Sequence, residues 1–249
     1  MQSSSQSSPF PPPKGEIEGA GNGMSFSKYQ IASAIAILFH TIGFLGIAVF
    51  KNTFIIQSTA FNLLLMFALL IWTQREKNYL FWLFLLITVV AGITVEIIGV
   101  NTKLLFGDYS YGNVLGIKVK NVPLIIGINW FIIIYCSGVS IYTLLTKAIK
   151  KIAAKTATPP MALKAVSVIV DGATLALFFD WLMEPVAVQL GYWKWAGEIP
   201  FYNYLCWFII AMVLLAIFHF LQFNKQNKFA VHLLMIQVMF FLLLRTFLN

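Results

Sequence analysis

The chain has 249 residues, of which 59% are apolar and only 10% are charged. A soluble domain carries about a quarter charged residues, so this composition cannot cover a surface that faces water. The net charge of +8 is spread over short segments between apolar stretches, which disfavours a concentrated basic surface for nucleic acid. The sequence therefore predicts an integral membrane protein that lies in a lipid bilayer and binds no nucleic acid.

The first 23 residues are polar and rich in serine, proline and glycine. We expect a disordered tail or leader at 1–23 and a polytopic membrane domain at 24–249. Seven apolar segments follow, each long enough to cross about 30 Å of hydrocarbon as a helix, the conformation that satisfies the backbone in lipid. The expected fold is an all-α integral membrane protein of about seven transmembrane helices, at 29–50, 53–73, 79–100, 123–146, 165–189, 201–222 and 229–248.

Basic residues are distributed unequally between the two sides of these expected spans. Most of the 17 Lys and Arg residues lie in the tail or in the loops after the second, fourth and sixth segments. Because cytoplasmic loops are the richer in Lys and Arg, we expect a cytoplasmic N-terminus and an outer C-terminus. A bacterial inner membrane is the expected location.

Two stretches of the chain share one spacing. Glu96 and Asp180 are each followed by ten residues and then by Gly-x-aromatic-x-aromatic, and farther on a proline precedes a Trp-Phe pair by seven residues. Such self-similarity indicates a duplicated helix-loop-helix unit. The third and fourth expected helices, and the fifth and sixth, would form parallel repeats about an axis along the membrane normal. The aromatic residues concerned are Tyr109, Tyr111 and Trp130 in one copy and Trp193, Trp195 and Trp207 in the other.

The repeat predicts an acid cluster, because an axis between the copies would bring Glu96 and Asp180 together. Glu184 lies one turn after Asp180 on the same face, and Pro185 is expected to kink or end that helix and open a small polar pocket. An acid within hydrocarbon costs about 2.5–3.5 kcal/mol on insertion scales, so we expect the cluster to have a function. The structural alternative is simple pairing with a neighbour: Asn129, Asn203, Lys103 or Lys194.

Carboxyl groups close together in apolar surroundings cannot all ionise easily, so the cluster is expected to keep a proton on one member. That member could protonate an electron-rich alkene, while an ionised partner and aromatic faces stabilise the carbocation and the carboxylate activates water. Three histidines and two cysteines give no spacing for a metal centre, and no phosphate-binding glycine loop is present. We therefore expect neither a metal nor another cofactor.

The same residues carry a family resemblance over roughly 79–210. Residues 96–123, with Gly-Asp-Tyr-Ser-Tyr at 107–111, resemble the first signature of the membrane carotenoid hydratases. Residues 180–203, with Asp-Trp-Leu-Met-Glu-Pro and Gly-Tyr-Trp-Lys-Trp, resemble the second, although Glu198 stands where that signature often has glycine. The resemblance implies a hydro-lyase of the carotenoid 1,2-hydratase type. Such an enzyme adds water to the terminal double bond of an acyclic carotenoid end group without a redox cofactor.

Within this resemblance the carboxyl geometry suggests roles. Asp180 is expected to donate the proton, Glu96 to be the ionised partner that activates water, and Glu184 to be an alternate acid. The expected substrate, lycopene, γ-carotene or a similar carotenoid, enters from lipid. Two alternatives stay open, a proton-initiated end-group cyclase that shields the cation from water and a proton-coupled membrane carrier. The expected substrate-binding residues are Tyr109, Tyr111, Trp130, Trp193, Trp195, Asn203 and Trp207.

Overall fold

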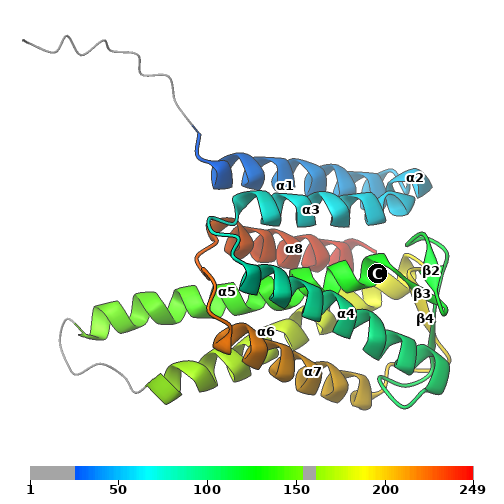
Figure 1. Cartoon of the computed structure of the whole chain (residues 1–249). Coiled ribbons are helices and arrows are strands. Elements are labelled where there is room, and N and C mark those ends of the chain that lie inside the picture. Colours follow the sequence, from blue (N-terminus) through cyan, green and yellow to red (C-terminus); the bar gives the residue numbers. More distant parts are fainter. Residues whose placement is uncertain (1–25, 154–160, 249) are drawn as a thin grey trace, which may run out of the picture.

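The structure is a computed structural model that describes residues 26–153 and 161–248, so the expected tail at 1–23 lies outside the described residues. Helices dominate, and the strands are short (Figure 1). The helices are α1 (Lys28–Phe44) with a π-helical extension (Leu45–Val49), α2 (Thr53–Gln57), α3 (Thr59–Thr73), α4 (Tyr79–Thr102), α5 (Ile125–Ala153), α6 (Met161–Gln189), α7 (Phe201–Phe220) and α8 (Lys228–Phe247). The strands are β1 (Tyr109–Tyr111), β2 (Lys118–Val119), β3 (Val122–Pro123) and β4 (Trp193–Trp195).

Across the described ranges, 6 helices are long and apolar enough to cross a membrane: α1 with its extension, α4, α5, α6, α7 and α8. The segment expected to span at 53–73 is instead divided into α2 and α3. The side chains of Ser58 and Thr59 each donate to the backbone carbonyl three residues earlier, a local bond that competes with a continuous helix. With 15 residues, α3 is about 22 Å long and does not span the hydrocarbon alone.

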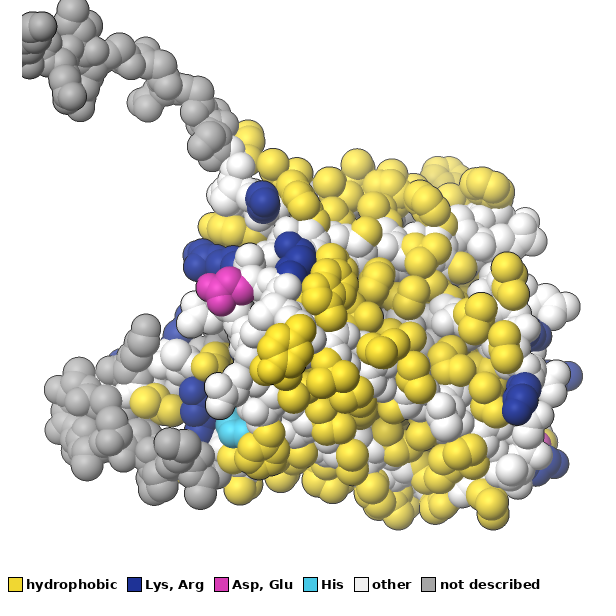
Figure 2. Space-filling model, viewed as in Figure 1, with side chains coloured by type: hydrophobic (Ala, Val, Ile, Leu, Met, Phe, Trp, Pro, Cys, Tyr) yellow, Lys and Arg dark blue, Asp and Glu magenta, His cyan; other side chains and the backbone are white. Residues whose placement is uncertain are grey.

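An apolar belt surrounds the molecule. Figure 2 shows hydrophobic side chains over the middle of the visible face, with Lys and Arg gathered toward the two ends. Large apolar side chains such as Phe54, Trp82 and Phe201 are exposed on the outside of the molecule. Exposed apolar surface of this extent is stable only against lipid. The chain is therefore an integral membrane protein with an all-α fold.

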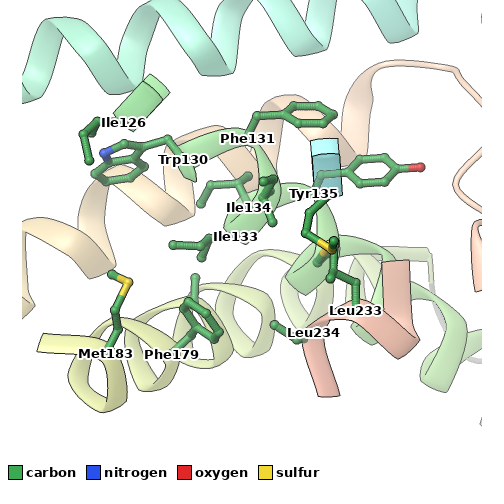
Figure 3. Close-up of a cluster of buried hydrophobic side chains, with 14 of the residues drawn as sticks. Ile126, Trp130, Phe131, Ile133, Ile134, Tyr135, Phe179, Met183, Leu233 and Leu234 are labelled. Carbon is green, nitrogen blue, oxygen red and sulfur yellow. The ribbon is translucent and has the colours of Figure 1, made fainter. Parts of the chain in front are cut away.

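The core lies around α5. In the apolar span of α5, 83% of the residues are buried, whereas less than half are buried in each of the other spanning helices. The side chains of α5 extend toward Phe179 of α6 and toward Leu233 and Leu234 of α8 (Figure 3). In Figure 1, α1, α3 and α8 lie on one side of α5, and α4, α6 and α7 lie on the other. This second group, together with α5, contains the two copies of the repeat.

The two copies run in the same direction, as parallel repeats require. In Figure 1, α4 and α6 both lead toward the end of the bundle that carries the strands, and α5 and α7 both return from it. The loops of the copies meet there, since β1 pairs with β4 in an antiparallel ribbon. A second small ribbon, β2 with β3, lies within the loop of the first copy.

Of the two expectations for Pro185, a kink or an end of the helix, the end is wrong, because α6 continues through the proline to Gln189, the limit of the expected span. Proline has no N–H to donate to the carbonyl of Trp181, four residues earlier. Arg245 of α8 compensates: its Nη1 lies 3.4 Å from that carbonyl oxygen, and its guanidinium lies 4.2 Å from the centre of the Trp181 ring. A donor from another helix thus replaces the lost backbone bond.

Candidate active site

The ribbon between β1 and β4 positions the aromatic residues of both copies. Tyr109 faces Trp195 and Tyr111 faces Trp193, so the pairing is symmetric about Ser110 and Lys194. The bonds that flank it are symmetric too. The N–H of Gly112 donates to the carbonyl of Tyr192 at 2.8 Å, and the N–H of Ala196 donates to that of Asp108 at 2.9 Å. Each of these residues has its counterpart in the other copy, so the repeat generates a local twofold axis through the ribbon.

Glu96, on α4, is buried and accepts three hydrogen bonds. The hydroxyl groups of Tyr109 and Tyr111 donate to its Oε2 at 2.6 and 2.7 Å, and the indole N–H of Trp130 donates to its Oε1 at 2.9 Å. Short bonds from three donors are typical of a carboxylate. The aromatic pair of the first copy therefore holds the acid of the first copy in one orientation.

The second copy uses a different acid for the equivalent role. The indole N–H groups of Trp193 and Trp195 donate to Oε2 of Glu184, at 2.9 and 3.1 Å, and not to Asp180. The amide of Asn203 lies between the two acids, 3.4 Å from Oδ2 of Asp180 and 3.5 Å from Oε1 of Glu184. Among the described residues, the 3.4 Å contact from Asn203 is the only hydrogen bond to the Asp180 side chain. Glu184 thus corresponds structurally to Glu96, one helical turn beyond the position that the sequence spacing matches.

Two tryptophans stack beside the acids. The rings of Trp130 on α5 and Trp207 on α7 are parallel within 3°, with their centroids 3.8 Å apart. They occupy equivalent positions after the prolines of the two copies, so the stack joins the copies much as the ribbon does. Gly92 on α4 makes room for Trp130, since a Cβ at this position would lie 2.6 Å from its Cγ.

Glu96, Asp180 and Glu184 line a single buried cavity of about 20 Å³, which is room for about one water molecule. The structure thus brings the three predicted acids to one place. Their catalytic role remains a prediction, as does the substrate-binding role of the other predicted residues. The cavity is also lined by Tyr109, Tyr111, Trp130, Trp193, Trp195, Asn203 and Trp207, together with Phe106, Ile126, Asn129 and Met183.

The environment of the acids is apolar and lacks a neutralising cation. Within the described ranges the acids form no ion pair: Lys103, expected as a possible partner, binds Asp108 at the surface at 2.6 Å, and Lys194 is exposed on the ribbon. Burial and the nearby Glu96 carboxyl raise the pKa of the Tyr109 and Tyr111 hydroxyl groups well above their usual range. Both phenols therefore stay protonated and act as hydrogen-bond donors at any physiological pH.

A second, larger cavity adjoins the first. It has a volume of about 470 Å³ and shares Ile126, Asn129, Met183 and Trp193 with the acid cavity. Sequence reasoning missed it, because most of its other wall residues come from α1, α2, α3 and α8, outside the two repeated units. His40 of α1 lies in this wall and bonds through Nδ1 to the carbonyl of Ala36 at 2.7 Å.

Comparisons with known proteins identify one family. The family model described as "Carotenoid biosynthesis protein" matches residues 53–249, which include the repeat, the ribbon and all three acids. No curated protein and no solved structure matches the chain.

Proposed function

The chain belongs to the carotenoid biosynthesis protein family, and from that premise we propose that it hydrates the terminal double bond of an acyclic carotenoid end group. It would be a hydro-lyase of the carotenoid 1,2-hydratase type. The observation that carries the proposal is the buried cavity in which three carboxyl groups, without a cation, meet a wall of tyrosines and tryptophans. Protonation of an alkene needs both an acid kept neutral in apolar surroundings and a way to stabilise the cation that forms.

The hydrogen bonds suggest which acid holds the proton. Glu96 accepts three bonds and Glu184 accepts two from indoles, and such bonds favour the ionised form. Asp180 has only the long contact from Asn203. We therefore assign Asp180 as the proton donor, Glu96 as the ionised partner, and Glu184 as the alternate acid.

In the proposed reaction the O–H bond of Asp180 breaks and its proton binds the CH carbon of the terminal double bond. The π electrons form the new C–H bond, leaving a tertiary cation that the Glu96 carboxylate and nearby indole faces stabilise. Water then attacks the cation and gives a proton back to the carboxyl cluster, which restores the acid. The net change is the addition of one water molecule, so the step needs no oxidant, reductant or other cofactor.

The size of the acid cavity favours hydration over cyclisation. Its volume of about 20 Å³ admits a water molecule but not a carotenoid end group. Water can thus stand next to the acids while the alkene approaches from the larger cavity, and a cation formed there has a nucleophile within reach. We further propose, from the distribution of basic residues, a bacterial inner membrane location with the N-terminus in the cytoplasm.

The test is expression in a host that accumulates lycopene, followed by pigment chromatography and mass spectrometry. We expect a product heavier than lycopene by one or two water molecules. Asp180→Asn and Glu96→Gln are each expected to lower its rate of formation by about 100-fold or more, the usual contribution of general acid–base catalysis. Asp171→Asn is the matched control, because Asp171 lies on the same helix but is exposed and outside the cavity.

Three outcomes would count against the proposal. Normal rates in correctly inserted Asp180→Asn and Glu96→Gln proteins would refute the site assignment. A cyclised product of unchanged mass would identify an end-group cyclase. Unchanged pigment together with uptake that depends on a proton gradient would identify a carrier.

A further inference from the structure

The cavity of about 470 Å³ lies between α1, α3, α6 and α8, and its volume is in the range of small-molecule sites. Its wall is mostly apolar and rich in aromatic rings, among them Phe39, Phe179, Phe240 and Phe241. A flat conjugated hydrocarbon makes extensive contact with such rings. The volume and the lining therefore suit a polyene better than a polar metabolite.

The cavity opens on the surface that faces lipid. Ile42 of α1, Phe54 of α2 and Phe61 of α3 line it and are also 46%, 71% and 61% exposed. Because these residues belong to the apolar belt of the molecule, a hydrocarbon can enter from the bilayer without crossing water. Entry is thus lateral, between the N-terminal helices.

The larger cavity also adjoins the cavity of the acids. Asn129 and Met183 belong to both cavities, as do Ile126 and Trp193. A linear molecule lying in the larger cavity would therefore present its end to the smaller one, with the rest of its length directed toward lipid.

Three polar side chains in the wall, those of Thr59, Tyr192 and His40, are paired within the protein, so these groups do not oppose an apolar ligand. The hydroxyl groups of Thr59 and Tyr192 bond to each other at 2.6 Å, and His40 bonds to the backbone of its own helix. Burial raises the pKa of Tyr192 to about 12, which keeps this phenol neutral. The cost of placing a hydrocarbon against these groups is correspondingly low.

We propose that this cavity binds the polyene chain of the carotenoid, with the acyclic end group against the acid cavity and the remainder extending through the mouth into lipid. The inference rests on the proposed function and names the place where its substrate lies. It also gives α1 a role. The acids belong to the matched residues 53–249, whereas the wall formed by Phe39, His40, Gly43 and Ile47 does not. In this arrangement α1 contributes to binding of the polyene, while the acids belong to the repeat.

The test measures binding separately from turnover. Asp180→Asn protein is isolated from a lycopene-accumulating host, and the bound pigment is measured by absorbance. In that background Asn62→Phe fills the cavity from α3. The Asn62 side chain lines the cavity, and its Oδ1 is buried with no hydrogen-bond partner in the part of the chain that the structure describes. Leu64→Phe is the matched control, since Leu64 lies on the same helix, faces lipid and does not line the cavity.

A second filling variant guards against misfolding. Gly43→Leu fills the cavity from α1, where an added Cβ has only ordinary contacts with Phe240, at 3.4 Å or more. Leu38→Phe on the outer face of α1 is its control. We expect each filling variant to retain about tenfold less lycopene than its control, which corresponds to about 1.4 kcal/mol of lost binding.

The outcomes separate the two proposals. Equal pigment in the filling variants and their controls would overturn the inference, even if the enzyme hydrates lycopene. So would a phospholipid in the extract, in place of carotenoid, whose amount falls in the filling variants. If lycopene binding depends on Asn62 and Gly43 but no hydrated product is ever formed, the inference stands and the proposed reaction fails.

Discussion

Gly92 lies where α4 packs against α5, directly beside the acid cavity. A Cβ at this position would be 2.6 Å from Cγ and 2.7 Å from Cβ of Trp130, whereas carbon atoms in contact are about 3.5–4.0 Å apart. The substitution Gly92→Ala must therefore displace the Trp130 side chain by about 1 Å. Overpacking of this kind costs about 1–3 kcal/mol of stability.

The displacement also reaches the site. The indole N–H of Trp130 lies 2.9 Å from Oε1 of Glu96, and a shift of about 1 Å takes this contact beyond hydrogen-bonding distance. A hydrogen bond to a charged group is worth about 1.5–3 kcal/mol. A misplacement of this size in an active site can cost about 100-fold in rate. We expect Gly92→Ala to form hydrated product about 10- to 100-fold more slowly, although all three carboxyl groups remain.

The assay compares product formation per inserted protein and the midpoint of thermal unfolding in detergent. Gly197→Ala is the matched control, because a Cβ at that position meets nothing within 4 Å. In a Trp130→Gly background, Gly92→Ala should cost little more, since the Cβ and ring atoms that it meets are gone. The reasoning is refuted if Gly92→Ala costs the same stability in both backgrounds. It is also refuted if the protein is as active and stable as the Gly197→Ala control.

Two further predictions concern the ends of the bundle. A Cβ on Gly112 would lie 2.0 Å from the backbone oxygen of Gly191, which cannot rotate away. Gly112→Ala should therefore separate the two strands of the ribbon, cost about 3 kcal/mol of stability and lower the unfolding midpoint. An unfolding midpoint equal to that of the wild type would contradict this. Burial and the nearby Lys164 lower the pKa of Lys225 to about 8, from 10.5. Between pH 8 and 10.5 the unfolded chain binds more protons than the folded chain, so the free energy of unfolding should rise with pH over this range. Lys225→Met should abolish the rise, and an unchanged slope would be evidence against this account.

Much of this architecture could be predicted from the sequence, because lipid restricts the choice of structure. Long apolar segments predict spanning helices, and six of these segments form helices close to the expected ranges. The repeat could be predicted because its markers, an acid, a glycine and paired aromatics, recur at fixed offsets. In the first copy the markers also lie together in the structure, since Tyr109 and Tyr111 bind Glu96.

The sequence could not predict features that depend on distant partners. Pro185 by itself suggests a kink or an end of the helix, and only the fold brings Arg245, 64 residues away from Trp181, to the free carbonyl of that residue. The spacing matches Asp180 with Glu96, yet the aromatic pair of the second copy donates to Glu184. Which of two acids on one helical face receives those bonds is decided by side-chain packing. Spacing along the chain carries no information about it.

This divergence between the copies accounts for the proposed chemistry better than a strict duplicate would. A symmetric pair of acids, each held by two aromatic donors, would have no preferred place for a proton. The second copy adds an acid. One aromatic pair donates to Glu96 and the other to Glu184, so Asp180 has only one long contact, with Asn203. Because three carboxyl groups in one apolar cavity cannot all ionise easily, we expect the proton on the one that accepts the fewest hydrogen bonds. The symmetric frame thus assembles the cavity, and in the proposed reaction the extra acid supplies the proton.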